Sequence, residues 1–139
     1  MGNKQCIFCG LQGVNKEQKL YEDDDIYIIK DRSPVAVLHL QCIPKRHIKN
    51  KNYLTIDDLK LLCHMFETAK NYIQINYPHL IKDNKNKPIF GFHKPPFYSV
   101  GHLHMHCIVP PYTNSYMKLM NCCIFEDFFD VIKNIKQNY

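Results

Sequence analysis

One short segment constrains this chain more than any other. Residues 102–109 (HLHMHCIV) alternate histidine with apolar side chains. Because successive side chains of a β-strand point to opposite faces, the segment predicts a strand with His102, His104 and His106 on one face. The apolar residues from Leu103 to Val109 would lie on the other face, against the core. Three imidazoles in register serve no evident structural purpose, so we expect this face to carry chemistry.

Two chemistries are compatible with such a face. Two imidazoles separated by one residue have a common ligand spacing for a divalent metal in a sheet. Alternatively, one imidazole is a nucleophile and its neighbours support it. With a pKa near 6.5, imidazole is mostly neutral and nucleophilic at pH 7, and it leaves readily once it is bound to phosphorus. The alternation alone leaves both interpretations open.

The remaining strand signals predict an α+β fold with a mostly antiparallel sheet of about five strands. Besides the histidine strand, we expect strands at 18–21, 26–30, 37–43 and 89–92. The first two flank an acidic turn at 23–25. The third is expected to stop at Pro44, which cannot donate to a β-ladder.

Two helices are expected. The first begins at Thr55, where Asp58 three residues later completes a capping-box pattern, and it ends before Pro78. Its apolar face carries Leu59, Leu62, Cys63, Phe66, Ala69 and Ile73. The second helix would place Phe125, Phe128, Phe129, Ile132 and Ile135 on one face near the end of the chain.

Composition narrows the function classes. A chain of 139 residues is the size of one domain, so we expect a single domain over 1–139. It has no apolar run of the roughly 18–20 residues that span a bilayer, and no hydrophobic leader. Seven cysteines without a signal peptide indicate a reducing compartment, the cytoplasm or alternatively the nucleus. A formal charge of +5 suits an anionic ligand, but the lysines are dispersed, so nucleic acid is not the favoured partner.

Three further motifs carry a family resemblance. Residues 91–99 (GFHKPPFYS) precede the histidines, residues 43–47 (IPKRH) lie upstream, and residues 6–9 (CIFC) lie near the start. With these motifs the chain resembles the histidine triad superfamily, whose signature is His-φ-His-φ-His-φ-φ with φ apolar. It is most similar to the branch that contains histidine triad nucleotide-binding protein type 3 and, more distantly, aprataxin. The resemblance runs from about Cys6 to the C-terminal helix.

The resemblance implies a role for each matching residue. His104 matches the nucleophile, which forms a nucleotidyl-histidine intermediate, and His106 matches the residue that contacts the phosphate and helps the leaving group depart. Ser99 matches a hydroxyl that donates to the leaving group or the phosphate, while His39 and His102 support the triad. The nucleotide-binding positions are Asp31, on the ribose hydroxyls, with Phe8, Ile29 and His93.

The implied activity is hydrolysis at the α-phosphate of an AMP derivative, of the adenosine 5′-monophosphoramidase type. The negative charge that develops on the phosphate would be met by imidazolium and backbone donors, so no catalytic metal is expected. An aprataxin-like removal of AMP from nucleic-acid 5′ ends is one alternative. A nucleotide-binding interaction module without catalysis is another. The resemblance also implies the histidine triad fold, with one long helix packed on the sheet and a C-terminal helix. It further implies a homodimer, for which the apolar helix face that begins at Leu59 is the candidate contact.

The Cys6-x-x-Cys9 pair has three interpretations. It suits a redox pair, but the βαβ setting of such pairs is missing, and it also suits two free thiols. Family members with this spacing bind zinc with two further histidines, which match His47 and His102. The resemblance therefore implies a closed, structural Cys2His2 zinc site.

Overall fold

The structure is a computed structural model that describes residues 6–10, 18–98, 100–113 and 124–138. Its centre is one six-stranded antiparallel sheet in the order β1-β2-β3-β5-β4-β6. The strands are β1 (Tyr21–Glu22), β2 (Ile26–Lys30), β3 (Ala36–Pro44), β4 (Ile89–His93), β5 (Met105–Tyr112) and β6 (Phe125–Asp127). The predicted α+β class and antiparallel sheet are confirmed, with one strand more than the five expected.

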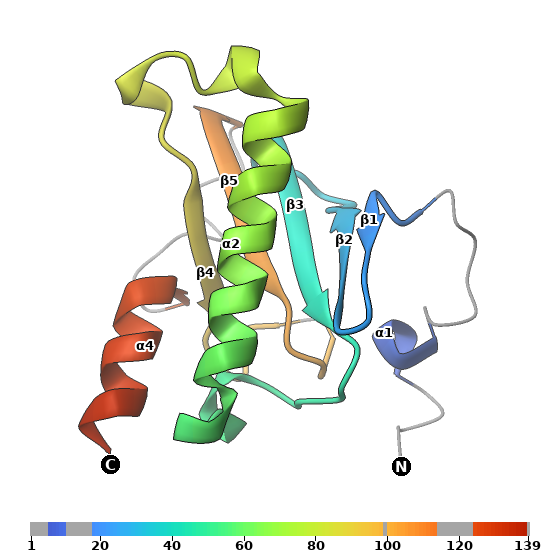
Figure 1. Cartoon of the computed structure of the whole chain (residues 1–139), viewed down its shortest axis with the longest axis vertical. Helices are drawn as coiled ribbons and strands as arrows, with labels where there is room; N and C mark the ends of the chain where they lie inside the picture. Colours follow the sequence, from blue (N-terminus) through green and yellow to red (C-terminus); the bar gives the residue numbers. More distant parts are fainter. Residues whose placement is uncertain (1–5, 11–17, 99, 114–123, 139) are drawn as a thin grey trace.

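One long helix, α2 (Leu59–Asn76), crosses one face of the sheet, and α4 (Phe128–Gln137) lies beside it (Figure 1). A single helical turn, α1 (Ile7–Gly10), lies at the opposite edge, near β1 and β2. Short 3-10 turns complete the described elements: η2 (Lys51–Tyr53), η3 (Ile56–Asp58), η4 (Pro78–Leu80) and η5 (Asn84–Asn86). The predicted cap at Thr55 is present, because its backbone N–H donates to Asp58 Oδ2 at 2.8 Å.

The apolar face of α2 packs on the sheet, which confirms the expectation of one long helix packed there. Leu62, Met65, Ala69 and Ile73 are completely buried within the chain's own core. These residues are therefore not available for the dimer contact that was expected on this face. Cys63, predicted on this face, is exposed. Helical spacing identified an apolar stripe but not its exact width or what covers it.

The C-terminal segment differs from its prediction at both ends of the aromatic cluster. Phe125 belongs to strand β6, and Phe129 is 61% exposed, so the buried face of α4 carries Phe128, Val131 and Ile135. Strand β6 can lie against β4 because Gly91 has no side chain. A Cβ atom at Gly91 would collide with the Phe125 ring and with the Glu126 carbonyl oxygen.

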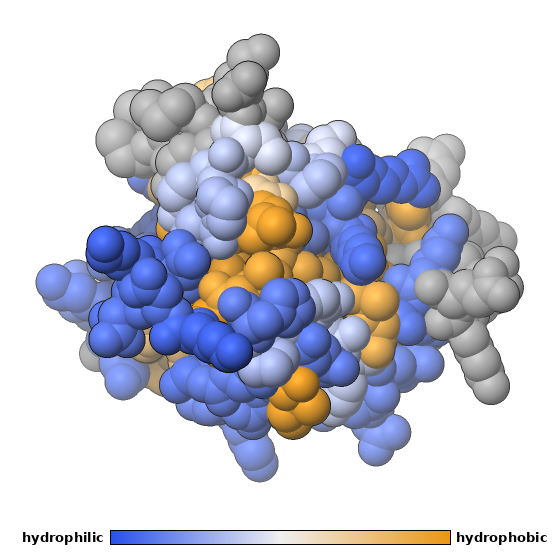
Figure 2. All heavy atoms as spheres, turned by 90° about the horizontal axis from the view of Figure 1, so that it is seen from above, coloured by the Kyte–Doolittle hydropathy of each residue, from blue (hydrophilic) through white to orange (hydrophobic). Residues whose placement is uncertain are grey.

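The two faces of the sheet have different roles. The α2 face holds the main core, whereas the other face carries the histidines of β3, β4 and β5. Figure 2 shows apolar side chains gathered at the centre of the end seen from above, ringed by hydrophilic residues. This end carries the last turn of α2, where Ile75 is 77% exposed. Among the described residues, no helix is both long and apolar enough to cross a membrane.

Candidate active site

The histidine segment forms a strand over only part of its predicted length. Strand β5 begins at Met105, so His102 and His104 precede it. The ring of His102 is fully buried, with its Nε2 2.7 Å from the Pro44 carbonyl oxygen, and like His104 it contacts Phe8. The predicted start of the strand at His102 is therefore wrong. His104 and His106 do lie together, with ring centroids 5.0 Å apart.

The position of one proton on His104 follows from its contact with the backbone. Its Nδ1 lies 2.7 Å from the carbonyl oxygen of His102. Because a carbonyl only accepts, Nδ1 carries the proton and donates it. In the neutral ring the lone pair is then on Nε2. This is the protonation state that a nucleophile needs, and the backbone holds it in place.

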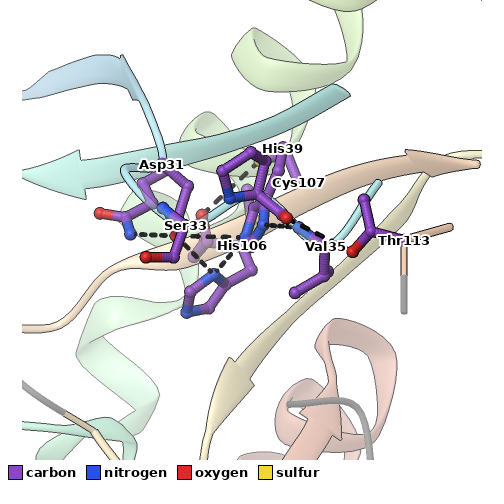
Figure 3. A network of polar contacts seen from close by, with 10 residues as sticks. Asp31, Ser33, Val35, His39, His106, Cys107 and Thr113 are labelled. Carbon is purple, nitrogen blue, oxygen red and sulfur yellow. Dashed lines mark hydrogen bonds and ion pairs between the residues drawn. The ribbon is translucent and has the colours of Figure 1, made fainter. Parts of the chain in front are cut away.

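His106 has the opposite tautomer, fixed by a chain of hydrogen bonds (Figure 3). The backbone N–H of Val35 donates to His39 Nδ1 at 3.2 Å, so the proton of His39 is on Nε2. His39 Nε2 lies 2.8 Å from His106 Nδ1 and donates to it. The proton of His106 is consequently on Nε2. That atom is buried and has no hydrogen-bond partner within the described part of the chain, so it is a donor available for a ligand.

Both rings are neutral in the free protein. Burial lowers the pKa of His104, which its bond to the His102 carbonyl only partly offsets. Burial lowers the pKa of His106 further, to well below the usual 6.5, and the neighbouring His104 and His93 add to the effect. Without a ligand, the site thus offers a neutral N–H donor beside a neutral nucleophile.

These shifts predict how stability depends on pH. Burial lowers the pKa of His39 and of His106, whereas both titrate near 6.5 in the unfolded chain. Below that pH the unfolded state binds more protons than the folded state. The free energy of unfolding is therefore highest above about pH 6.5 and falls as the pH decreases. We expect the Tm to drop between pH 7 and pH 5 in calorimetry. His106→Asn should flatten this dependence, whereas His79→Gln, at an exposed position, should not. Equal Tm values of the wild-type protein at pH 5 and pH 7 would contradict this prediction.

Asp31 is tied into the same network. Its Oδ1 accepts from the Ser33 backbone N–H at 2.8 Å, and its Oδ2 accepts from Gln41 Nε2 at 2.6 Å. Oδ2 also lies 3.3 Å from His39 Nε2. The carboxylate is therefore held at a fixed place beside the histidines, with lone pairs remaining on both oxygens. Sequence reasoning did not identify Gln41, whose only signal is its position two residues after His39 on the same face of β3.

A cavity of about 1000 Å³ brings the predicted nucleotide-binding residues together. Phe8, Ile29, Asp31 and His93 all line it, as do His104 and His106. The Phe8 ring is 7% exposed and meets His104 edge-on, with centroids 5.3 Å apart. Apolar walls and convergent polar groups are the usual composition of a small-molecule site. Ser99, the predicted hydroxyl donor, lies outside the described residues.

The four predicted metal ligands also converge, on the other side of Phe8. The Nδ1 atoms of His47 and His102 are 3.1 Å apart. Cys9 Sγ lies 3.2 Å from His47 Nδ1 and 3.4 Å from His102 Nδ1, and Cys6 Sγ lies 3.4 Å from His102 Nδ1. In a tetrahedral zinc site these N···N and S···N edges are about 3.3 and 3.6 Å. The group could therefore hold a metal ion.

The protonation of these groups supports the same interpretation. Nε2 of His102 donates to the Pro44 carbonyl, so the lone pair of its neutral ring is on Nδ1 and points toward the two thiols. Burial, together with Cys6, raises the pKa of the Cys9 thiol to about 11. Reactive redox thiols have lowered pKa values, so this environment does not favour the redox interpretation.

Comparisons with known proteins agree with this geometry. The family described as "Scavenger mRNA decapping enzyme C-term binding" matches residues 5–121. Adenosine 5′-monophosphoramidase HINT3 of Xenopus tropicalis is 36% identical over 109 residues, which cover 76% of this chain and 67% of that protein. The bifunctional adenosine 5′-phosphosulfate phosphorylase/adenylylsulfatase HINT4 of Arabidopsis thaliana is 36% identical over 113 residues, covering 79% and 73%.

A solved structure shows the same fold. The HIT family hydrolase of Legionella pneumophila superposes with a TM-score of 0.62 at 30% identity, over 74% of this chain and 90% of that one. Motifs, geometry and relatives point the same way, and the chain belongs to the histidine triad superfamily, with similarity to its HINT3 members.

Proposed function

We propose that this protein is a nucleotide hydrolase that acts on the α-phosphate of AMP derivatives, as an adenosine 5′-monophosphoramidase does, through a nucleotidyl-His104 intermediate. One observation carries the proposal: His104 and His106 face one cavity in opposite tautomers. One offers a lone pair and the other an N–H, which are the two groups that attack on a phosphate requires. The HINT3 and HINT4 relatives, whose names are those of enzymes acting on adenylates, support the substrate class.

The reaction follows from these protonation states. The lone pair of His104 Nε2 attacks the α-phosphorus, and the bond from phosphorus to the leaving group breaks with its electron pair. His106 Nε2–H donates to a phosphate oxygen as charge develops there, and costs little reorganisation because its donor is already fixed. Water then attacks the phosphorus, the bond to His104 breaks, and AMP is released. Imidazole is a good leaving group in this second step.

The rest of the cavity would orient the nucleotide. We place the base against Phe8 and Ile29 and the ribose hydroxyls at Asp31, whose carboxylate retains lone pairs for them. The immobilised ring of His104 would then meet the phosphate in line. No step in this scheme calls on a magnesium ion.

A screen of substrates tests the function. Wild-type protein without added magnesium is expected to hydrolyse AMP-morpholidate faster than diadenosine tetraphosphate or a 5′-adenylated DNA. The release of AMP is followed by chromatography, with boiled protein as the control. Faster cleavage of the adenylated DNA would favour the aprataxin-like activity. AMP binding without turnover of any of the three compounds would instead indicate a binding module.

We also propose that Cys6, Cys9, His47 and His102 hold one structural zinc ion. The spacing of the four donor atoms and the lone pair on His102 Nδ1 support it. Four protein ligands leave no open position for water, so the ion would stabilise the fold without joining the reaction. Through His102, the site would fix the backbone carbonyl that orients His104.

Homodimerisation, which the family resemblance implies, stays a prediction. The buried residues of the α2 face pack in the chain's own core, so they would not supply its contact surface. The mass in solution, measured by light scattering, would decide it.

A further inference from the structure

The proposed reaction raises the question of where the leaving group obtains its proton, and the proton donor assigned below rests on that proposed function. When phosphorus–nitrogen cleavage releases an amine, the departing nitrogen keeps the bonding electron pair and must gain one proton. A group that donates this proton has to be refilled during the second step, in which the attacking water gives one up.

His106 is not suited to supply that proton. Burial lowers the pKa of His106 and of His39, so neither ring takes up a second proton near neutral pH. If the neutral ring of His106 gave up Nε2–H it would become an imidazolate, which is a strong base. A proton moved from His39 Nε2 to His106 Nδ1 would only pass this charge to His39, whose Nδ1 accepts from the backbone amide of Val35.

Asp31 offers no alternative. In both hydrogen bonds formed by its carboxylate among the described residues, to the Ser33 amide and to Gln41, it is the acceptor. The carboxylate beside His39 stabilises the hydrogen bonds of His39 and His106, but it has no proton to donate into the cavity. The role that the structure leaves to His106 is that of a fixed hydrogen-bond donor to the phosphate.

A fourth histidine lies beside this chain of hydrogen bonds but is not part of it. His93, the last residue of β4, lies with its ring centroid 4.3 Å from that of His106. It lines the large cavity, and it also lines a small adjoining hollow together with His104 and Tyr98. Unlike His39 and His106, it is partly exposed. We propose that His93 gives the proton to the leaving group and regains one from the attacking water.

The charges around His93 are compatible with this cycle. His104 just before β5, His106 on β5 and His39 on β3 are neutral rings, because burial lowers the pKa of each. From β6, Phe125 contacts His93 with an apolar ring, at 5.9 Å between centroids. Lys49 and Lys51 line the same hollow, and Lys51 is paired with Glu126 of β6 at 2.6 Å. Apart from the nucleophile His104, His93 is thus the histidine of this cluster that is partly exposed and lines both hollows.

The test exploits the dependence on the leaving group. His93→Gln is compared with His79→Gln, a matched change at an exposed histidine outside the cavity. The substrates are AMP-morpholidate, whose amine needs a proton, and the p-nitrophenyl ester of AMP, whose phenolate does not. For His93→Gln we expect kcat/KM to fall on the order of 100-fold on the amide and by less than about threefold on the ester.

Each other outcome overturns the proposal. Equal losses on both substrates would mean that His93 only supports the structure, and no loss on either would remove it from the reaction. If Ser99→Ala, and not His93→Gln, gives the leaving-group-dependent loss, the proton passes through Ser99. If wild-type protein cleaves neither compound, the proposed function fails and the role of His93 fails with it. If wild type cleaves both and His93→Gln retains its full rate on the amide, only the role of His93 fails.

Discussion

His104→Asn is expected to reduce single-turnover hydrolysis of AMP-morpholidate on the order of 10³–10⁵-fold, with AMP binding nearly unchanged. The reason is specific to the protonation state of the ring. The His102 carbonyl holds the proton on Nδ1 of His104, so Nε2 is the one atom of that side chain with a free lone pair. An asparagine amide keeps a donor near the carbonyl but offers no nucleophilic nitrogen. The remaining donors and the cavity still bind the nucleotide, so the loss should appear in the chemical step.

Rapid-quench kinetics and intact-protein mass measure the two consequences. Wild-type protein should show a transient mass increase of one adenylate, and the variant should show none. His79→Asn is the matched control, since His79 is exposed and lies outside the cavity. His104→Gly with added imidazole should recover part of the rate, because free imidazole can occupy the vacated space. A variant that keeps more than a few per cent of the wild-type rate would remove His104 as the nucleophile.

The histidine face shows what alternation can and cannot predict. The period of two correctly placed His104 and His106 beside each other on the face opposite the core. It did not predict that the strand begins only at Met105, or that the His102 ring bonds to Pro44 and lies beside Cys6 and Cys9. These partners lie far from His102 in the sequence, so a local sequence pattern cannot predict them.

The tautomers were beyond sequence reasoning for a similar reason. They depend on a backbone N–H, that of Val35, and a backbone amide has no signature in a sequence. The same applies to Gly91, which looks like an ordinary strand residue until the Phe125 ring is seen above it. For α2, both the apolar period and its packing on the sheet agree with expectation, but the period alone does not show which residues of the stripe stay exposed, as Cys63 does. Local chemistry was therefore predictable, whereas the partners of each group required the fold.

Loss of the metal site is expected to have the largest effect on stability. Cys6→Ser removes one thiolate from a group in which Cys6, Cys9, His47 and His102 lie within 4.8 Å of one another. Free energies of zinc binding add directly to the free energy of unfolding, because the unfolded chain has no formed site. We expect the Tm to fall by roughly 10 °C or more, together with the zinc content measured by elemental analysis. Cys63→Ser, at an exposed thiol on α2, should change neither.

In the Cys6→Ser variant, turnover at 25 °C should be reduced only slightly although the Tm falls. The proposed zinc ion would affect the reaction only by holding other residues in place. A zinc ion would anchor α1, whose Phe8 lies against both His102 and His104, with ring centroids 5.9 and 5.3 Å away. It would also anchor the His102 carbonyl that orients the nucleophile. Both contacts can persist in the folded fraction of the variant at low temperature, because Leu103 still donates to the Ile48 carbonyl at 2.6 Å and holds this segment to its neighbour. Zinc-free wild-type protein, with Cys6 and Cys9 both reactive toward a thiol reagent in the native state, would contradict the site and leave the pair as two thiols beside two imidazoles.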